Sequence, residues 1–457
     1  MRKSDSLDAR IGATIRLAIN VAKRVQGERH DMSGAEAIQG AKGGSGRIRS
    51  LAEVARGFSS GERIFLPGST GESAEFTRAL CEAAQPIDIT ASFVPGINPV
   101  PLAALPEGTI VSSLFSPPAD RNAKPRATFR HLPFSYGGFA AHLRDHLTFD
   151  ACVVHVAPPD DAGRCSLGTA VEFTPLAVSK SKRVIAIINP RVPRLPNAAF
   201  LPFACFDEVV ECDAPLREYV VGPPTEQASA IAGHVADFIG DGAALQIGLG
   251  KVPDALMARL TDRRGLRLHS GMLSDGVKAL VEAGALDLNF ATVSCVHVGS
   301  RAHYEWLAGR ADFSVRGCDY THDPGVLASL SGFVAVNSAL SVDLFGQANL
   351  EMLDGRAISG VGGASDFARG AALAPGGLSI IALPATSGKS DLPRIIPSLS
   401  GLCSLPRTDI HVVVTEHGAA DLRGLSMIER AERLIEVAAP QHRGALRETW
   451  REMAKRL

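Results

Sequence analysis

The sequence predicts an α/β fold in which two similar domains are each built on a mainly parallel sheet. Short apolar runs recur along the whole chain, and stretches with helical periodicity separate several of them. Continuous apolar runs indicate strands buried on both faces, as in parallel sheets that helices cover. A length of 457 residues favours at least two domains, because single cores rarely grow that large.

The expected strands and helices alternate in both halves of the chain. In the first half, strands are expected at Arg63–Leu66, Gly108–Ser113, Ala151–Val156 and Arg183–Ile188, with helices at Glu72–Ala84 and Gly138–His146. The Gly- and Pro-rich segment 220–226 is typical of a linker, and a helix is expected after it at Ala228–Ile239. In the second half, strands are expected at Ala244–Ile247, Val334–Asn337, Leu378–Leu383 and Ile410–Thr415.

These patterns divide the chain into three parts. Residues 1–47 are expected to form an N-terminal extension, helical up to about Val25 and then rich in Gly, Ser and charged residues. Residues 48–224 are expected to form the first α/β domain and residues 225–457 the second. The sequence contains no short-period repeat and no low-complexity tract.

Composition excludes several classes of protein. The net charge of −1 gives no global field to attract nucleic acid or an anionic membrane. No apolar run approaches the roughly 18 residues that a membrane helix needs, and the N-terminus does not resemble a signal peptide. The eight cysteines are scattered, without a CxxC pair or metal-like spacing, so no metal site and a reducing, cytoplasmic location are expected.

Three loops carry residues suited to ligand binding. The run Gln246–Met257 reads as strand, glycine turn and helix, so its free N–H groups could hold a phosphate; a simple tight turn is an equal alternative. Stacked glycines in Ser359–Phe367 would allow a ligand close to the backbone and suit an oxyanion. The run Thr415–Gly424 gathers ionisable side chains, which mark either a site or a loop held by ion pairs.

Together with further motifs, these loops resemble the acetyl-CoA hydrolase and transferase family, which includes acetate, succinate, butyrate and 4-hydroxybutyrate CoA-transferases. The resemblance covers about residues 64–457. The motifs that carry it occur in the family's order: Pro67–Glu72, Ala157–Gly168, Gly248–Asp254, His269–Gly276, Gly360–Phe367, Pro406–Asp409 and Val414–Gly424.

The resemblance implies two CoA-transferase α/β domains with an acyl-CoA site at their junction. It also implies a homodimer or homotetramer, acyl-CoA and a small carboxylate as substrates, and no tightly bound cofactor. In typical members a glutamate attacks the acyl-CoA and becomes an enzyme-bound CoA thioester. The residues expected to contact CoA are Gly248, Leu249, Gly250, Lys251, Val252, Ala339, Gly362 and Gly363.

One position departs from the family pattern. The family's glutamate is the third residue of a run that reads His269–Gly276 here, which places Gly271 where the nucleophile is expected. Glycine has no side chain that could form an acyl anhydride or a thioester. The downstream residues Ser274, Asp275 and Gly276 fix the register of this match.

Two other residues are candidates for catalysis. His322 stands where relatives commonly have an asparagine, and its imidazole could act as a general base on water or be a tolerated polar residue. Glu351 is the nearest surviving carboxylate among the motifs, and a supporting role is favoured for it. His269 keeps the family's identity and is interpreted as structural.

Three functions therefore remain open from the sequence. The protein could transfer CoA by direct attack of the acceptor carboxylate on a short-chain acyl-CoA, with sequential kinetics. It could hydrolyse acyl-CoA with water activated by His322 or Glu351. It could also bind CoA without catalysis, for which the glycine at position 271 is the supporting feature.

Overall fold

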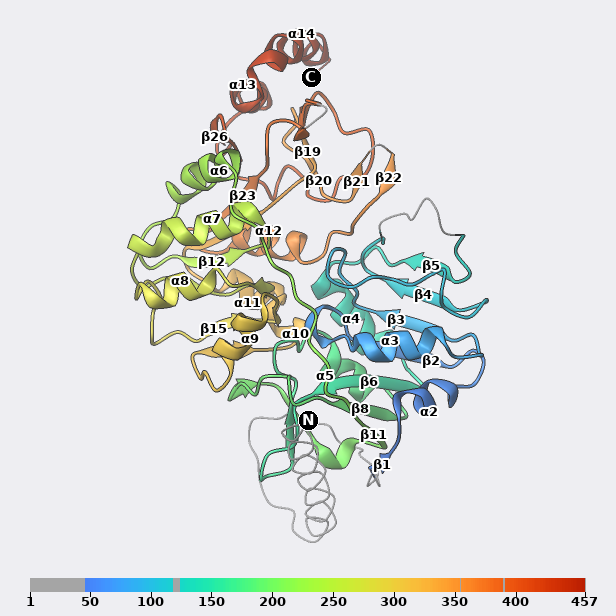
Figure 1. The fold of residues 1–457 in the computed structure, drawn as a ribbon. Helices are drawn as coiled ribbons and strands as arrows, with labels where there is room; N and C mark the ends of the chain where they lie inside the picture. Colours follow the sequence, from blue (N-terminus) through green and yellow to red (C-terminus); the bar gives the residue numbers. More distant parts are fainter. Residues whose placement is uncertain (1–45, 118–123, 354, 389–390, 457) are drawn as a thin grey trace.

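The computed structural model describes residues 46–117, 124–353, 355–388 and 391–456. Its framework is two open sheets, one built from each half of the chain (Figure 1). Nearly all neighbouring strands in these sheets are parallel, which confirms the predicted α/β fold. The expected N-terminal extension lies outside the described residues, apart from its last two, 46 and 47.

The first sheet has eight strands in the order β1-β11-β8-β6-β2-β3-β4-β5. Every neighbouring pair is parallel. The central strands β6 and β8 are buried along their whole length, as their continuous apolar sequences predict. The strands are β1 Arg47–Ile48, β2 Arg63–Leu66, β3 Asp88–Ala91, β4 Ile110–Ser113, β5 Thr128–His131, β6 Ala151–Val156, β8 Val184–Ile188 and β11 Glu208–Glu211.

The second sheet has six strands in the order β13-β12-β18-β23-β25-β26. Only the edge strand β26 is antiparallel to its neighbour. The strands are β12 Ala244–Ile247, β13 Arg267–Leu268, β18 Phe333–Asn337, β23 Leu378–Ala382, β25 Val412–Thr415 and β26 Gly418–Asp421.

Helices cover both sheets. Those of the first half are α2 Leu51–Arg56, α3 Ala74–Cys81, α4 Tyr136–His146 and α5 Thr174–Ser179. Those of the second half are α6 Glu226–Ala236, α7 Lys251–Arg259, α8 Val277–Glu282, α9 Arg301–Leu307, α10 Cys318–Thr321, α11 Pro324–Ala328, α12 Ala364–Leu373, α13 Met427–Val437 and α14 Arg443–Ala454. In the described ranges, none of these helices has the length and apolar character needed to span a bilayer.

Small sheets join the two halves near α10. Strand β9 of the first half pairs with β17 of the second, and isolated bridges link Ala170 to Val296 and Glu172 to Gly317. Figure 1 shows α4, α5 and α10 close together between the halves. The small-sheet strands are β7 Arg164–Ser166, β9 Asn197–Ala198, β10 Phe200–Pro202, β14 Met272–Leu273, β15 Thr292–Ser294, β16 Val296–His297, β17 Phe313–Val315, β19 Ser341–Asp343, β20 Ala348–Asn349, β21 Met352–Leu353, β22 Arg356–Ala357 and β24 Ile395–Ile396.

Several observed bounds differ from the predicted ones for local reasons. Helix α6 begins at Glu226 because the Thr225 side chain accepts a hydrogen bond from the Ala228 N–H and caps it. Helix α3 begins after Ser73, which caps it in the same way. Strand β4 begins two residues late because Gly108 has a φ of +88°, outside the β region. The domain boundary at 224/225 falls between β11 and β12 and stays a prediction.

Candidate active site

Gly271 lies in a buried turn between β13 and β14. Its carbonyl accepts hydrogen bonds from the N–H groups of Cys295, at 2.9 Å, and Val296, at 3.1 Å. The backbone at Gly271 is outside the left-handed region, so a residue with a side chain could adopt this conformation. The neighbouring side chains, and not the backbone conformation, therefore decide which residue types fit at position 271.

His322 and Phe367 fill the space that a side chain at position 271 would enter. A Cβ atom placed on Gly271 would lie 3.2 Å from His322 Nε2 and 3.3 Å from Phe367 Cε2. A Cβ atom on Gly363 would lie 2.4 Å from the same Nε2. The structure thus brings together three residues that the sequence predicted for the site, His322, Gly271 and Gly363. With Phe367 they form what we call the His322 cluster.

The His322 ring is held between aromatic side chains. Its centroid lies 5.1 Å from the Tyr136 ring and 4.6 Å from the Phe367 ring. Burial, with a smaller contribution from the nearby His269, lowers the pKa of His322 to about 3. The imidazole is therefore neutral at physiological pH.

Hydrogen bonds on the other side fix the ring. His322 Nδ1 lies 2.9 Å from the Thr321 hydroxyl oxygen. His269 Nε2 lies 3.0 Å from the Thr321 carbonyl, which ties the end of α10 to the turn at residue 271. This contact agrees with the structural interpretation of His269.

The glycine loop 360–363 packs against the first half of the chain. Its Gly362 carbonyl accepts a hydrogen bond from the Tyr136 N–H at 3.0 Å, and a Cβ atom on Gly360 would lie 1.9 Å from the Leu114 carbonyl oxygen. Gly362 has a φ of +56°. The sequence predicted close approach of a ligand to this loop, and the observed close approach is to α4 and the end of β4.

The predicted CoA loop lines an open hollow of about 340 Å³, here called the α7 hollow. Leu249, Gly250, Lys251 and Val252 lie along it, together with Ser338, the residue before Ala339. Gly250 is the N-cap of α7, with a φ of +121°, and it has no side chain that could cap the first N–H groups of the helix. A Cβ atom on Gly248 would meet nothing within 4 Å.

Glu416 braces the wall of the α7 hollow. One of its carboxylate oxygens accepts a hydrogen bond from Gln227 Nε2 at 2.6 Å, and the other accepts one from the Ala385 N–H at 2.9 Å. Nearby, Arg423 pairs with Asp421 at 2.6 Å. The ionisable run at 415–424 thus includes ion-pair and bracing contacts, one of its two predicted interpretations.

Glu351 forms its hydrogen bonds with residues outside the His322 cluster. Its carboxylate accepts a hydrogen bond from the Ser404 hydroxyl at 2.7 Å, and its carbonyl accepts one from the Ile358 N–H at 2.8 Å. Among the described residues, no hydrogen bond links it to Gly271 or His322. It supports the loop that leads into the glycine cluster.

Comparisons with known proteins confirm the family resemblance. Residues 299–450 match the family model for the acetyl-CoA hydrolase/transferase C-terminal domain. The 4-hydroxybutyrate coenzyme A transferase of Clostridium kluyveri is 36% identical over 308 residues, 66% of this chain and 72% of that protein. The chain belongs to the acetyl-CoA hydrolase/transferase family. It is therefore an enzyme of the CoA-transferase or acetyl-CoA hydrolase kind.

More distant members of the family extend the match to most of the chain. Succinyl-CoA:cyclohexane-1-carboxylate CoA transferase of Geobacter metallireducens is 29% identical, in a match that covers 89% of this chain and 95% of that protein. The acetyl-CoA hydrolase of Kluyveromyces lactis is 27% identical, in a match that covers 67% of this chain and 66% of that protein. The crystal structure of RipA from Yersinia pestis superimposes with a TM-score of 0.81 at 27% identity, covering 89% and 98% of the two chains.

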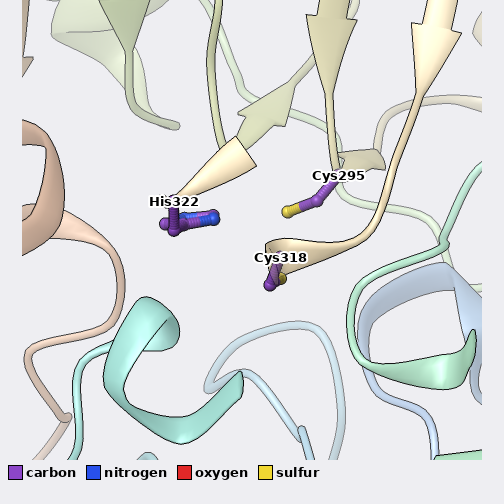
Figure 2. Close-up of side chains that lie close together, drawn as sticks. All are labelled: Cys295, Cys318 and His322. Carbon is purple, nitrogen blue, oxygen red and sulfur yellow. The ribbon is translucent and has the colours of Figure 1, made fainter. Parts of the chain in front are cut away.

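Two cysteines near position 271 were missed by the reasoning from sequence. Cys295 Sγ donates a hydrogen bond to the Gly271 carbonyl at 3.0 Å. The possible ligand atoms of Cys295, Cys318 and His322 all lie within 4.8 Å of one another (Figure 2). The four-residue spacing of Cys318 and His322 was the one local signal, because residues at i and i+4 share a helix face.

Proposed function

We propose that this enzyme transfers CoA from a short-chain acyl-CoA to a small carboxylate without forming a thioester on residue 271. The observation that carries this proposal is the His322 cluster. At the position where the resemblance places the family's glutamate, the chain has glycine, and His322 and Phe367 occupy the space beside it. No carboxylate is therefore available there to hold CoA covalently.

In the proposed reaction the acceptor takes the role of the missing glutamate. An acceptor carboxylate oxygen attacks the thioester carbonyl carbon, the C–S bond breaks, and CoA leaves as a thiolate. The resulting mixed anhydride is then attacked by that thiolate at the acceptor's carbonyl carbon. The C–O bond breaks, giving the acceptor's CoA thioester and the donor's carboxylate, so both substrates must be bound together.

The α7 hollow supports binding of CoA. Phosphate groups are favoured at a helix N-terminus by free N–H groups and by the helix dipole, and the exposed Lys251 adds a positive charge there. The glycine loop 360–363 is the proposed source of N–H donors to the oxyanion. The homodimer or homotetramer expected from the resemblance stays a prediction.

Direct transfer fits the chemistry of the His322 cluster better than hydrolysis does. A carboxylate acceptor is already an anion, whereas water must lose a proton to a base as it attacks. His322 is buried between two aromatic rings, where an imidazolium ion is poorly solvated. The carboxylate of Glu351, the other candidate base, accepts a hydrogen bond from the Ser404 hydroxyl of a distant segment.

Initial-rate kinetics test this proposal directly. Purified protein is assayed with a panel of short acyl-CoAs, each with and without acetate or succinate. We expect CoA exchange only when an acceptor is present, with intersecting double-reciprocal lines that indicate a ternary complex. Free thiol produced without an acceptor would establish hydrolysis instead, and CoA binding without turnover would establish a non-catalytic role.

A further inference from the structure

Three side chains that bind soft metals converge beside Gly271. Cys295 lies between β15 and β16, Cys318 is the first residue of α10, and His322 directly follows that helix. Their exposed fractions are 0%, 0% and 1%. In Figure 2 the nitrogen-bearing end of the His322 ring points toward the Cys295 sulfur, and Cys318 lies close by. We call these residues the Cys–Cys–His triad.

The donor set selects the kind of ion. Two thiolates and an imidazole suit thiophilic d-block ions, and they suit Mg²⁺ or Ca²⁺ poorly because those ions prefer oxygen ligands. Zn²⁺ is commonly bound by combinations of cysteine and histidine in tetrahedral geometry. A triad supplies three of the four positions, which leaves one for water or another oxygen.

The contacts of Thr321 prepare His322 to be a ligand. The Thr321 hydroxyl donates to the Gly317 carbonyl at 3.2 Å, and a hydroxyl has only one proton to donate. It then accepts a hydrogen bond from His322 Nδ1–H, which leaves the lone pair on Nε2 free. Histidine ligands are typically oriented in this way by a hydrogen bond to the other ring nitrogen.

An unsatisfied hydroxyl next to the triad is a second, independent observation. Tyr136 is 3% exposed, and its hydroxyl has no hydrogen-bond partner among the residues that the structure describes. The Tyr136 ring packs against His322, with the two ring centroids 5.1 Å apart. A buried hydroxyl without a partner is costly, and a bound ion or its water would satisfy it.

We propose that Cys295, Cys318 and His322 bind one thiophilic divalent transition-metal ion, with Zn²⁺ as the expected occupant. Binding deprotonates both thiols and releases two protons to solvent. The Cys295 thiol gives up its hydrogen bond to the Gly271 carbonyl in exchange for the ion. The metal site goes beyond the proposed function and does not depend on it. Both proposals exclude His322 as a general base, because a histidine that coordinates a metal has no lone pair left to accept a proton.

Metal analysis of the full-length protein tests the site without any activity assay. The protein is produced in zinc-supplemented medium, dialysed against a weak chelator, and its metal content is measured by atomic emission. We expect about one zinc per chain. Replacement by Co²⁺ should give the intense visible bands of a tetrahedral ion together with a sulfur-to-cobalt charge-transfer band.

Matched cysteine variants locate the ion. Cys295→Ser and Cys318→Ser should lose the zinc and the charge-transfer band, and His322→Cys should retain both because it supplies another thiolate. Cys165→Ser is the control, since Cys165 is equally buried but lies in β7, outside the triad. Circular dichroism reports whether each variant is folded. The proposal is overturned if wild-type protein retains no stoichiometric metal, or if folded Cys295→Ser and Cys318→Ser keep as much as Cys165→Ser.

Discussion

The α7 hollow and the His322 cluster differ in the room they leave around their glycines. A Cβ atom on Gly248, which directly precedes the lining residues of the hollow, would meet nothing within 4 Å, whereas a Cβ atom on Gly363 would lie 2.4 Å from His322 Nε2. The hollow is an open backbone surface of the kind that binds a large ligand. The cluster is closed by side chains from distant segments. Adding a side chain should therefore lower stability in the cluster and have little effect on stability in the hollow.

The largest expected difference is in the stability of matched glycine variants. Gly363→Ala should lower the free energy of unfolding by about 3 kcal/mol and abolish turnover, because the added methyl group overpacks His322 and Phe367. Gly248→Ala should leave stability nearly unchanged. Urea unfolding of both variants measures this. Equal losses of stability in the two variants would show that Gly248 and Gly363 do not differ in the space around them.

The next effect concerns a half-buried carboxylate beside the glycine loop. Asp366 on α12 accepts hydrogen bonds from the Ser135 hydroxyl and the Gly137 N–H of the first half. Burial raises its pKa from 3.8 to about 6, against the smaller opposing effect of these hydrogen bonds. The folded state thus holds the proton more tightly, so this contribution to stability is present below about pH 4 and is lost as the pH rises through 6.

Asp366→Asn removes that proton exchange. Between pH 4 and pH 6.5 the wild-type protein should lose up to about 3 kcal/mol of stability that the variant does not lose, since one pKa unit corresponds to about 1.4 kcal/mol. Urea unfolding across this range, with the variant subtracted from the wild type, measures the difference. Parallel pH profiles would show that Asp366 is not the titrating group.

A smaller effect tests whether positions 271 and 322 form a pair. Gly271→Glu alone should be destabilised, because its Cβ atom lies 3.2 Å from His322 Nε2. Adding His322→Asn should recover about 1 to 2 kcal/mol as a coupling energy. The double variant should also form an enzyme thioester that borohydride reduces. Additive energies and no thioester would show that the assigned register is wrong.

The smallest effect is expected at the open hollow. Lys251→Ala removes an exposed charge at the start of α7, which should raise the KM for acyl-CoA about fivefold, since such contacts contribute about 1 kcal/mol. The effect should shrink at high salt. Lys455→Ala, at the far end of the chain, is the control. A KM that is unchanged in the Lys251 variant would place CoA elsewhere.

The fold was largely predictable because its central strands are locally encoded. Ala151–Val156 and Ala244–Ile247 were predicted with the observed bounds, since continuous apolar runs have few alternatives to burial. Helix starts were less predictable. The start of α6 depends on a cap by Thr225, which lies in a segment that composition alone assigns to a linker.

The candidate site was predictable only where it is made of one segment. The residues from Leu249 to Val252 are continuous in sequence, and they line the same hollow. The contact of Cys295 with Cys318 and His322 depends on how β15, β16 and α10 pack, so no sequence spacing could reveal it. The pairing of Gly271 with His322 has the same origin, because their proximity is set by tertiary packing.

Chemical trapping shows whether CoA is transferred without an enzyme thioester. The wild-type protein is incubated with the acyl-CoA that it turns over fastest, treated with sodium borohydride, and then assayed for remaining activity and intact mass. We expect full activity and an unchanged mass. Inactivation that depends on acyl-CoA, with a mass change localised to a carboxylate side chain of this chain, would contradict this expectation.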